Sequence, residues 1–281
     1  MISIDGKVSR HTFDGDQNPL HRVSAFASES LLVLAQSKVS DKSNEINAIP
    51  ELLALLDLSG SIVTIDAMGC QRAIAEHIQE AKADYVLSLK GNQGTLHDDV
   101  KLPFQDGHIL EKLDEESLYI DVDSDHGRIE TRQSKVLKMP PELAKIHQWP
   151  GLKTGVEIDS TREIKDKLDH EKRYYISSLE GGAKDMLYAI RSHWAIENSL
   201  HYVLDIAFKD DESRIRKGNA PMNIGIIKQV ALNLLRKNQR KRESIKGLRK
   251  IAGWNNERLS QSFFNEVART LLFTGLDSRC R

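Results

Sequence analysis

Residues 61–71 read SIVTIDAMGCQ, and this stretch indicates the class of fold. The β-forming residues 61–65 predict a buried strand, and a helix is expected from about Gln71 to Ala81. Asp66 lies between the two elements. Ligand sites of α/β proteins lie beyond the carboxyl ends of their strands. Asp66 is therefore a candidate site residue.

The flanking segments continue this alternation of strands and helices. Further strands are expected over residues 1–5, 19–28, 31–39 and 85–89, and a helix that starts near Ser43. A tight turn between the second and third strands favours an antiparallel meander. The resulting order β-β-β-α-β-α-β predicts an α/β protein with a mixed sheet and helices packed on it.

The second half of the chain changes pattern twice. Alternating residues and prolines over about 95–180 predict a β-rich insertion or extension of the sheet, not a separate domain. Helices are expected over 183–210 and about 222–239. The first of these carries His193, Glu197 and His201, which are spaced four residues apart and are expected on one polar face.

Three acids are candidate metal ligands. Asp5 and Asp66 each end a run of β-forming residues, and Glu197 lies in the helical region. Clustered carboxylates repel one another unless a cation neutralises them, and oxygen ligands favour Mg²⁺ or Mn²⁺ over zinc. Two such ions can activate a water or a 3′-hydroxyl and stabilise the leaving oxygen. The acids therefore predict phosphoryl transfer on DNA. Individually, Asp5 could instead be a turn residue and Glu197 a surface residue.

Composition limits the possible partners. The chain has 281 residues, 40% apolar and 29% charged, with a formal net charge of −1, so total charge does not argue for nucleic acid. The distribution is uneven: residues 98–125 hold ten acids, whereas residues 214–250 hold twelve Lys or Arg and one acid. This basic flank is expected either as a solvated surface or as a phosphate-binding surface.

Compartment signals are few. Only Cys70 and Cys280 are present, which fits a reducing cytoplasm and excludes a disulfide scaffold. The first twenty residues lack the apolar core of a signal peptide, and no apolar run reaches the roughly 20 residues of a membrane helix. A cytoplasmic protein without membrane contact is expected.

Beyond these features, the sequence resembles a known family. It is similar to the ISAs-type insertion-sequence transposases, which include the H-repeat-associated proteins. The similar stretches run from residue 2 to about 240 and are IDGK (4–7), PLHRVSAF (19–26), KSNEI (42–46), TIDAMGCQ (64–71), LKGNQ (89–93), HGRIETR (126–132), HWAIENSLH (193–201) and RKGNAP (216–221). The resemblance thus covers most of the chain.

The resemblance implies a DDE-class DNA transposase with a ribonuclease-H-like mixed sheet. It implies a catalytic core over residues 1–240, with the β-rich insertion (about 95–180) before the last catalytic helix. The residues themselves predict a basic helical tail over 241–281. Asp5, Asp66 and Glu197 would be the catalytic residues and the ligands of two Mg²⁺ or Mn²⁺ ions. The implied partners are double-stranded DNA, as element ends and target, and further copies of the chain in a synaptic complex.

Several other residues are candidate DNA contacts. They are Lys90, Asn92 and Gln93 in a glycine loop, Arg128 and Arg132 in the insertion, His193 and His201 beside Glu197, and Arg214, Arg216 and Lys217 after the glutamate helix. Each set has a structural alternative, such as helix capping for the glycine loop and mutual ion pairs with Glu130 for the two insertion arginines. Trp194 is expected in the core rather than as a stacking platform.

Two rival functions remain open on sequence grounds. Members of the family that the sequence resembles usually carry several dozen residues before the first aspartate, whereas this chain begins four residues before Asp5. The tail after about Gly253 also departs from the family pattern. The chain could therefore be a truncated, inactive remnant that at most binds DNA. His193, Glu197 and His201 could alternatively hold zinc on one helix face, as in a zinc hydrolase.

Overall fold

The computed structural model describes residues 1–13, 18–40, 44–125, 127–165 and 167–260. The strands are β1 (Ile2–Ser9), β2 (Leu20–Ala27), β3 (Leu32–Lys38), β4 (Ile62–Ile65), β5 (Asp84–Leu89), β6 (Leu118–Asp125), β7 (Arg128–Lys138), β8 (Thr154–Ile164) and β9 (Lys167–Ser177). The α-helices are α1 (Glu45–Leu53), α2 (Arg72–Glu80), α3 (Thr95–Lys101), α4 (Gly107–Leu110), α5 (Pro141–Ile146), α6 (Ala183–Ala195), α7 (Tyr202–Phe208), α8 (Ala220–Lys237) and α9 (Ile245–Trp254). Two 3₁₀ turns, η1 (Gly91–Gln93) and η2 (Leu102–Gln105), and a π-helical turn, η3 (Ile196–His201), complete the described chain.

The described strands form one mixed sheet in the order β3-β2-β1-β4-β5-β9-β8-β7-β6. An antiparallel meander, β1 to β3, is followed by β4 and β5, which run parallel to β1. The strands β4 and β5 are almost wholly buried, as expected for parallel strands covered on both faces. The sheet and its flanking helices confirm the ribonuclease-H-like α/β fold class.

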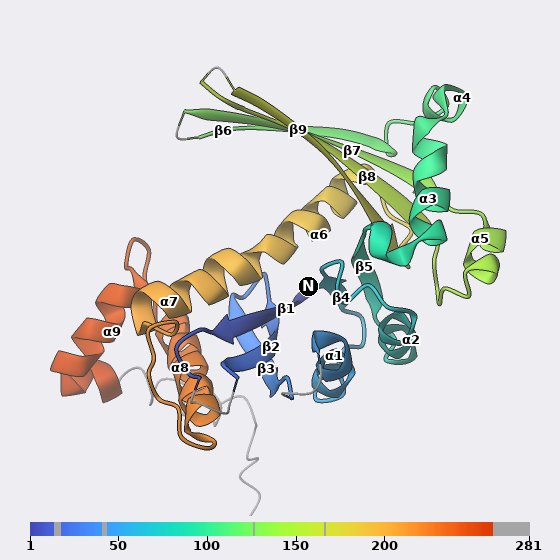
Figure 1. Ribbon diagram of the computed structural model, residues 1–281. Helices are drawn as coiled ribbons and strands as arrows, with labels where there is room; N and C mark the ends of the chain where they lie inside the picture. The colour runs from blue at the N-terminus through green and yellow to red at the C-terminus, as the bar shows by residue number, and fades with distance from the viewer. Residues whose placement is uncertain (14–17, 41–43, 126, 166, 261–281) are drawn as a thin grey trace, which may run out of the picture.

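The β-rich region extends this sheet instead of forming a separate body. β9 pairs antiparallel with β5, and β8, β7 and β6 follow outward. The outer ends of these four long strands project beyond the core as a twisted arm, which Figure 1 shows above α6. The expected insertion before the glutamate helix is therefore present, and it places its arginine-bearing strands over that helix.

Helices cover both faces of the sheet. One face packs against α1 and α2, where Leu52 and Ile74 are fully buried beside Ile4 and Leu87. The other face packs against α6, whose Met186, Leu187 and Ile190 contact residues of β5, β8 and β9. A third cluster joins α7 and α8 to β2 and β3. The central strand ends are thus held between two helical layers (Figure 1).

The predicted helix over 183–210 is present but not regular. Its middle, Ile196–His201, is a π-helical turn between α6 and α7. Such turns insert an extra residue into the helical repeat. The regular helical spacing expected for His193, Glu197 and His201 is therefore interrupted. Local sequence carries no clear signal for this irregularity.

Candidate active site

Strand register brings the two aspartates together. In the parallel pair β1–β4, Ile4 lies opposite Ile65. Asp5 and Asp66 each follow one member of this pair, so they occupy neighbouring positions at the same edge of the sheet. Asp66 follows the end of β4, whereas Asp5 lies inside β1, which continues to Ser9, so the expected strand end at Asp5 is wrong. The register nevertheless places the two acids side by side.

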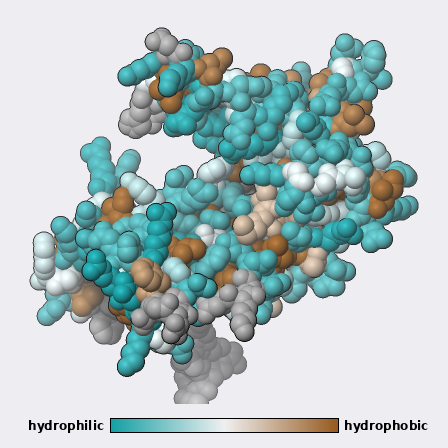
Figure 2. Space-filling model, viewed as in Figure 1, coloured by the Kyte–Doolittle hydropathy of each residue, from teal (hydrophilic) through white to brown (hydrophobic). Residues whose placement is uncertain are grey.

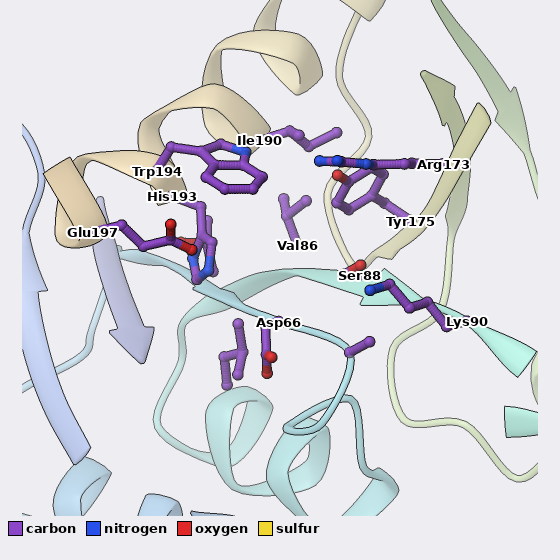
Figure 3. A pocket seen from close by; sticks show the side chains of 13 residues that line it. Asp66, Val86, Ser88, Lys90, Arg173, Tyr175, Ile190, His193, Trp194 and Glu197 are labelled. Carbon is purple, nitrogen blue, oxygen red and sulfur yellow. The ribbon is translucent and has the colours of Figure 1, made fainter. Parts of the chain in front are cut away.

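Glu197 reaches the same region from the π-helical turn, which packs on β1. A pocket of about 190 Å³ has both Asp66 and Glu197 in its lining. Figure 3 shows these two carboxylates on one side of the pocket and Lys90 and Arg173 on the other. The pocket thus has an acidic wall and a basic wall. It suits an anionic ligand that binds a metal ion at the acidic wall and places further negative charge against the basic wall.

The acids influence one another electrostatically. Burial raises the pKa of Asp5 to about 7, and the charges of Asp66, Glu45 and Glu197 add to the rise. Burial, followed by the charge of Asp66, also raises the pKa of Glu197. This excess of negative charge is what a bound cation would relieve, and an all-carboxylate set matches a hard divalent ion. The residues therefore fit Mg²⁺ or Mn²⁺.

The acids do not already surround a single ion. Within the described ranges, no group of three or more His, Cys, Asp or Glu side chains could hold one metal ion as placed. A fourth acid, Glu45, lies nearby in the first turn of α1, and no motif marks it as a site residue. Its carboxylate forms a hydrogen bond with Nε2 of His21 at 2.6 Å and rests against Gly6, where any side chain would collide with it.

The loop after Asp66 is held by two of the predicted DNA contacts. Asp66 accepts hydrogen bonds from the backbone N–H groups of Met68 and Gly69, at 3.1 and 3.3 Å. Asn92 donates to the carbonyl of Ala67 at 2.9 Å, and Gln93 donates to the carbonyl of Cys70 at 2.6 Å. These amides fix the Asp66 loop, a structural role that the sequence did not reveal. Their contact with DNA stays a prediction.

Replacing Asn92 with alanine is expected to lower the free energy of unfolding by about 1 kcal/mol, because the Ala67 carbonyl loses its donor. Urea unfolding followed by circular dichroism measures this change. Lys145→Ala, on exposed α5, is the control and should leave stability within about 0.5 kcal/mol. An unchanged Asn92→Ala midpoint would show that the amide does not stabilise the loop.

The two histidines flanking Glu197 have separate partners. The Nδ1 atom of His193 lies 3.1 Å from the Thr64 hydroxyl, and burial lowers the pKa of this histidine. His201 places Nδ1 3.4 Å from an oxygen of Asp5, and burial, with Lys7 and Arg22, lowers its pKa to about 3. Both are therefore neutral near pH 7. Because they serve different partners, the structure gives the one-face zinc site no support.

The predicted basic residues fall into two regions. Lys90 lines the acidic pocket, and Arg128 and Arg132 line an adjoining groove of about 1050 Å³ that also includes Glu197. Both arginines pair with Glu130, so these three side chains share one face as expected and form mutual ion pairs. The space-filling view in Figure 2 shows a deep polar hollow between the arm and the α6 layer.

The other predicted contacts lie after α7. Arg214 and Lys217 are exposed, whereas Arg216 donates to the carbonyl of His11 at 3.1 Å and stacks on Phe13. The pocket lining places none of these three residues beside the acids. Their role in DNA binding stays a prediction.

Two residues at the pocket were not identified from the sequence. Arg173, on β9, lines the pocket opposite Asp66 and Glu197. Trp194 lines it too and is 40% exposed, so its expected place in the core is wrong. The Arg173 guanidinium stacks on the Trp194 ring, 5.3 Å from its centroid. Arg173 lies in an ordinary strand with no motif, whereas Trp194 belongs to the stretch HWAIENSLH but was assigned to the core.

None of the helices in the described ranges has the length and apolar character needed to cross a membrane.

Comparison with known proteins places the chain in a family. A family model described as "Transposase DDE domain" matches residues 2–234. "Putative transposase YncI" of Escherichia coli O157:H7 is 46% identical over 250 residues, covering 84% of this chain and 62% of that protein. "H repeat-associated putative transposase YhhI" of Escherichia coli strain K12 is 41% identical over 244 residues, covering 84% and 64%.

The chain thus spans less than two thirds of the length of these relatives. Among solved structures, a piggyBac transposase synaptic complex with hairpin DNA matches with a TM-score of 0.46 and 12% identity, over 87% of this chain and 49% of that one. The family match over residues 2–234, together with the two E. coli relatives, shows that this chain belongs to the DDE transposase family, in the group of the H-repeat-associated proteins.

Proposed function

We propose that this chain is the catalytic part of a DNA transposase that cuts DNA at insertion-sequence ends and joins the freed 3′-hydroxyl to target DNA. The observation that supports the proposal is that Asp5 lies beside Asp66 in the register of β1 and β4, while Asp66 and Glu197 line one pocket. Membership of the DDE family supports the same reaction class.

Asp5, Asp66 and Glu197 would hold two Mg²⁺ or Mn²⁺ ions, which supply activation of the attacking oxygen and stabilisation of the leaving oxygen. Divalent metal ions are general in this family. The chain's own contribution is positional: the N–H groups of Met68 and Gly69 orient Asp66, and His201 lies against Asp5. Lys90, across the pocket, would attract the phosphate.

The partners follow from the same proposal. Double-stranded DNA, as element ends and target, would contact the basic candidates Lys90, Arg128, Arg132, Arg214, Arg216 and Lys217. Two or more copies of the chain would assemble with the paired ends. The catalytic core would be residues 1–240, and the tail 241–281 would support DNA binding; residues 261–281 lie outside the described part of the chain.

Metal removal tests the proposal directly. We expect the purified protein to nick a supercoiled plasmid carrying the DNA that flanks its gene in Mg²⁺ or Mn²⁺, and not in EDTA, because the clustered carboxylates need a cation to bind a phosphate. Conversion of supercoiled to open-circular plasmid on a gel is the measurement. A plasmid without the flanking DNA is the control. Salt-sensitive binding without nicking in any divalent metal would contradict the proposal and favour an inactive remnant.

A further inference from the structure

Three hollows of the surface meet at Arg173. This residue lines the acidic pocket, the large groove under the β6–β9 arm, and a third hollow of about 610 Å³ between β5, β9 and α3. The pocket and groove also share Trp194 and Glu197, and the pocket and third hollow also share Ser88 and Lys90. The three hollows therefore adjoin one another, and Asp66 and Glu197 line the pocket that borders the other two, so the hollows could form one path.

Cations line both ends of this path. The groove contains Arg128, Arg132, Arg162 and Arg191 in addition to Arg173. The third hollow contains Lys90, Lys101 and Lys172, with Glu171 as its acid. The groove also contains Asp169, Glu171 and Glu130, and the last of these pairs with Arg128, Arg132 and Arg162. A polyanion whose reacting phosphate lies at the centre would exchange such ion pairs for contacts with its phosphates.

The pocket in the middle of the path is small. The acidic pocket holds only about 190 Å³, against about 1050 Å³ in the groove beside it. That volume is comparable to cavities of about 150 Å³ that admit one aromatic ring. The exposed indole of Trp194 forms a wall of the pocket (Figure 3), which suits stacking with a single base.

Arg173 is oriented before any ligand arrives. Its Nε and Nη2 atoms each donate to Glu171 at 2.8 Å, and its guanidinium face lies on the Trp194 ring. A guanidinium group that is already held on two sides loses little conformational entropy when it binds a phosphate. The same two contacts place Arg173 at the mouth of all three hollows.

We propose that one DNA strand, separated from its complement at the acids, runs from the arm groove through the acidic pocket into the lysine hollow, with Arg173 on the phosphate and Trp194 on a base beside it. This deepens the proposed function, on which it rests, by naming the form of DNA that the centre of the site accepts. It also assigns DNA contacts to Arg173 and Trp194, which were not among the predicted DNA contacts.

Binding without metal tests this path separately from the chemistry. Fluorescence anisotropy of a labelled 20-nucleotide single strand is measured in EDTA over a range of NaCl concentrations. Arg173→Gln and Lys90→Gln should each weaken binding about tenfold, and each should reduce the slope of log Kd against log salt by about 0.7, the value for one phosphate contact on a single strand. Lys145→Gln, on α5, is the matched control and should change neither quantity.

Trp194→Leu examines the stacking contact. It should weaken single-strand binding about tenfold without changing the salt slope, and weaken binding to a blunt duplex of the same sequence much less. Circular dichroism of each variant establishes that it is folded. Equal losses for single strand and duplex would overturn the single-strand path.

The outcomes also separate this proposal from the proposed function. The path is wrong if Arg173→Gln and Trp194→Leu bind the single strand as tightly as the unsubstituted protein does. It is also wrong if only Lys246→Gln and Lys250→Gln, on α9, lose binding. Either result counts against the path even where metal-dependent nicking is found. If the path variants lose binding but the protein never nicks DNA with metal, the path stands and the catalytic proposal falls.

Discussion

Asp66→Asn is expected to reduce Mg²⁺-dependent nicking by at least about 1,000-fold, about 4 kcal/mol of transition-state stabilisation. Asparagine keeps the shape of the side chain and its acceptor for the Met68 and Gly69 N–H groups, so the loop should keep its conformation. What is lost is one negative charge at the position between Asp5 and Glu197. The rate of plasmid nicking at saturating DNA is the measurement.

The control for this variant is Asp57→Asn. Asp57 is exposed in the loop between α1 and β4 and accepts only a local hydrogen bond from Ser59 among the contacts described. Its substitution should leave the nicking rate within twofold. DNA binding in EDTA should not weaken in Asp66→Asn, because removal of a carboxylate cannot reduce attraction to phosphate. A nicking rate within tenfold of the unsubstituted protein would remove Asp66 from the site.

The elements around the acids were predictable because they obey simple periods. The buried strands 62–65 and 84–89 and the helix 72–80 lie within a residue or two of the expected ranges. Asp5 and Asp66 were recognisable because each follows a short β-forming run, and the parallel pairing of these runs then places the two acids side by side, although β1 continues beyond Asp5. Hydrophobic pattern and chain order were sufficient for this part of the molecule.

The rest of the site depends on contacts between distant segments. Arg173 belongs to a strand whose pairing with β5 brings it to the pocket, and strand pairing across ninety residues has no local signal. The π-helical turn changes the direction of Glu197 and His201 relative to a regular helix. Asn92 and Gln93 look like phosphate ligands in a glycine loop, yet their amides bond to the Asp66 loop.

A buried charge cluster holds the helices that follow Glu197 against the meander. Asp210 pairs with Arg22 of β2 and with Lys228 of α8 at 2.8 Å, and accepts from Ser9 at 3.0 Å. The side chains of Arg22 and Asp210 are only 1% and 3% exposed. Burial raises the pKa of Asp210, but Arg22 and Lys228 outweigh it and hold the pKa below its usual value. Asp210 is therefore ionised, and it neutralises two cations.

Asp210→Ala is accordingly expected to lower the free energy of unfolding by about 3–5 kcal/mol, because it leaves Arg22 buried without its counter-charge. The midpoint of urea unfolding measures the loss. Glu212→Ala, which removes a pair 66% exposed on both sides, is the control and should change stability by less than about 0.5 kcal/mol. Since the native pKa is depressed, the cluster stabilises the fold above about pH 4 and its contribution disappears as the pH falls further.

The double variant Arg22→Met, Asp210→Leu separates an unpaired charge from a general packing defect. The two apolar substitutions remove both buried charges, while Lys228, 14% exposed, can turn its amine towards water. We therefore expect the double variant to recover at least half of the stability lost in Asp210→Ala. If it is as unstable as the single variant, the charge pairing is not what joins α8 to β2, and shape alone holds these elements together.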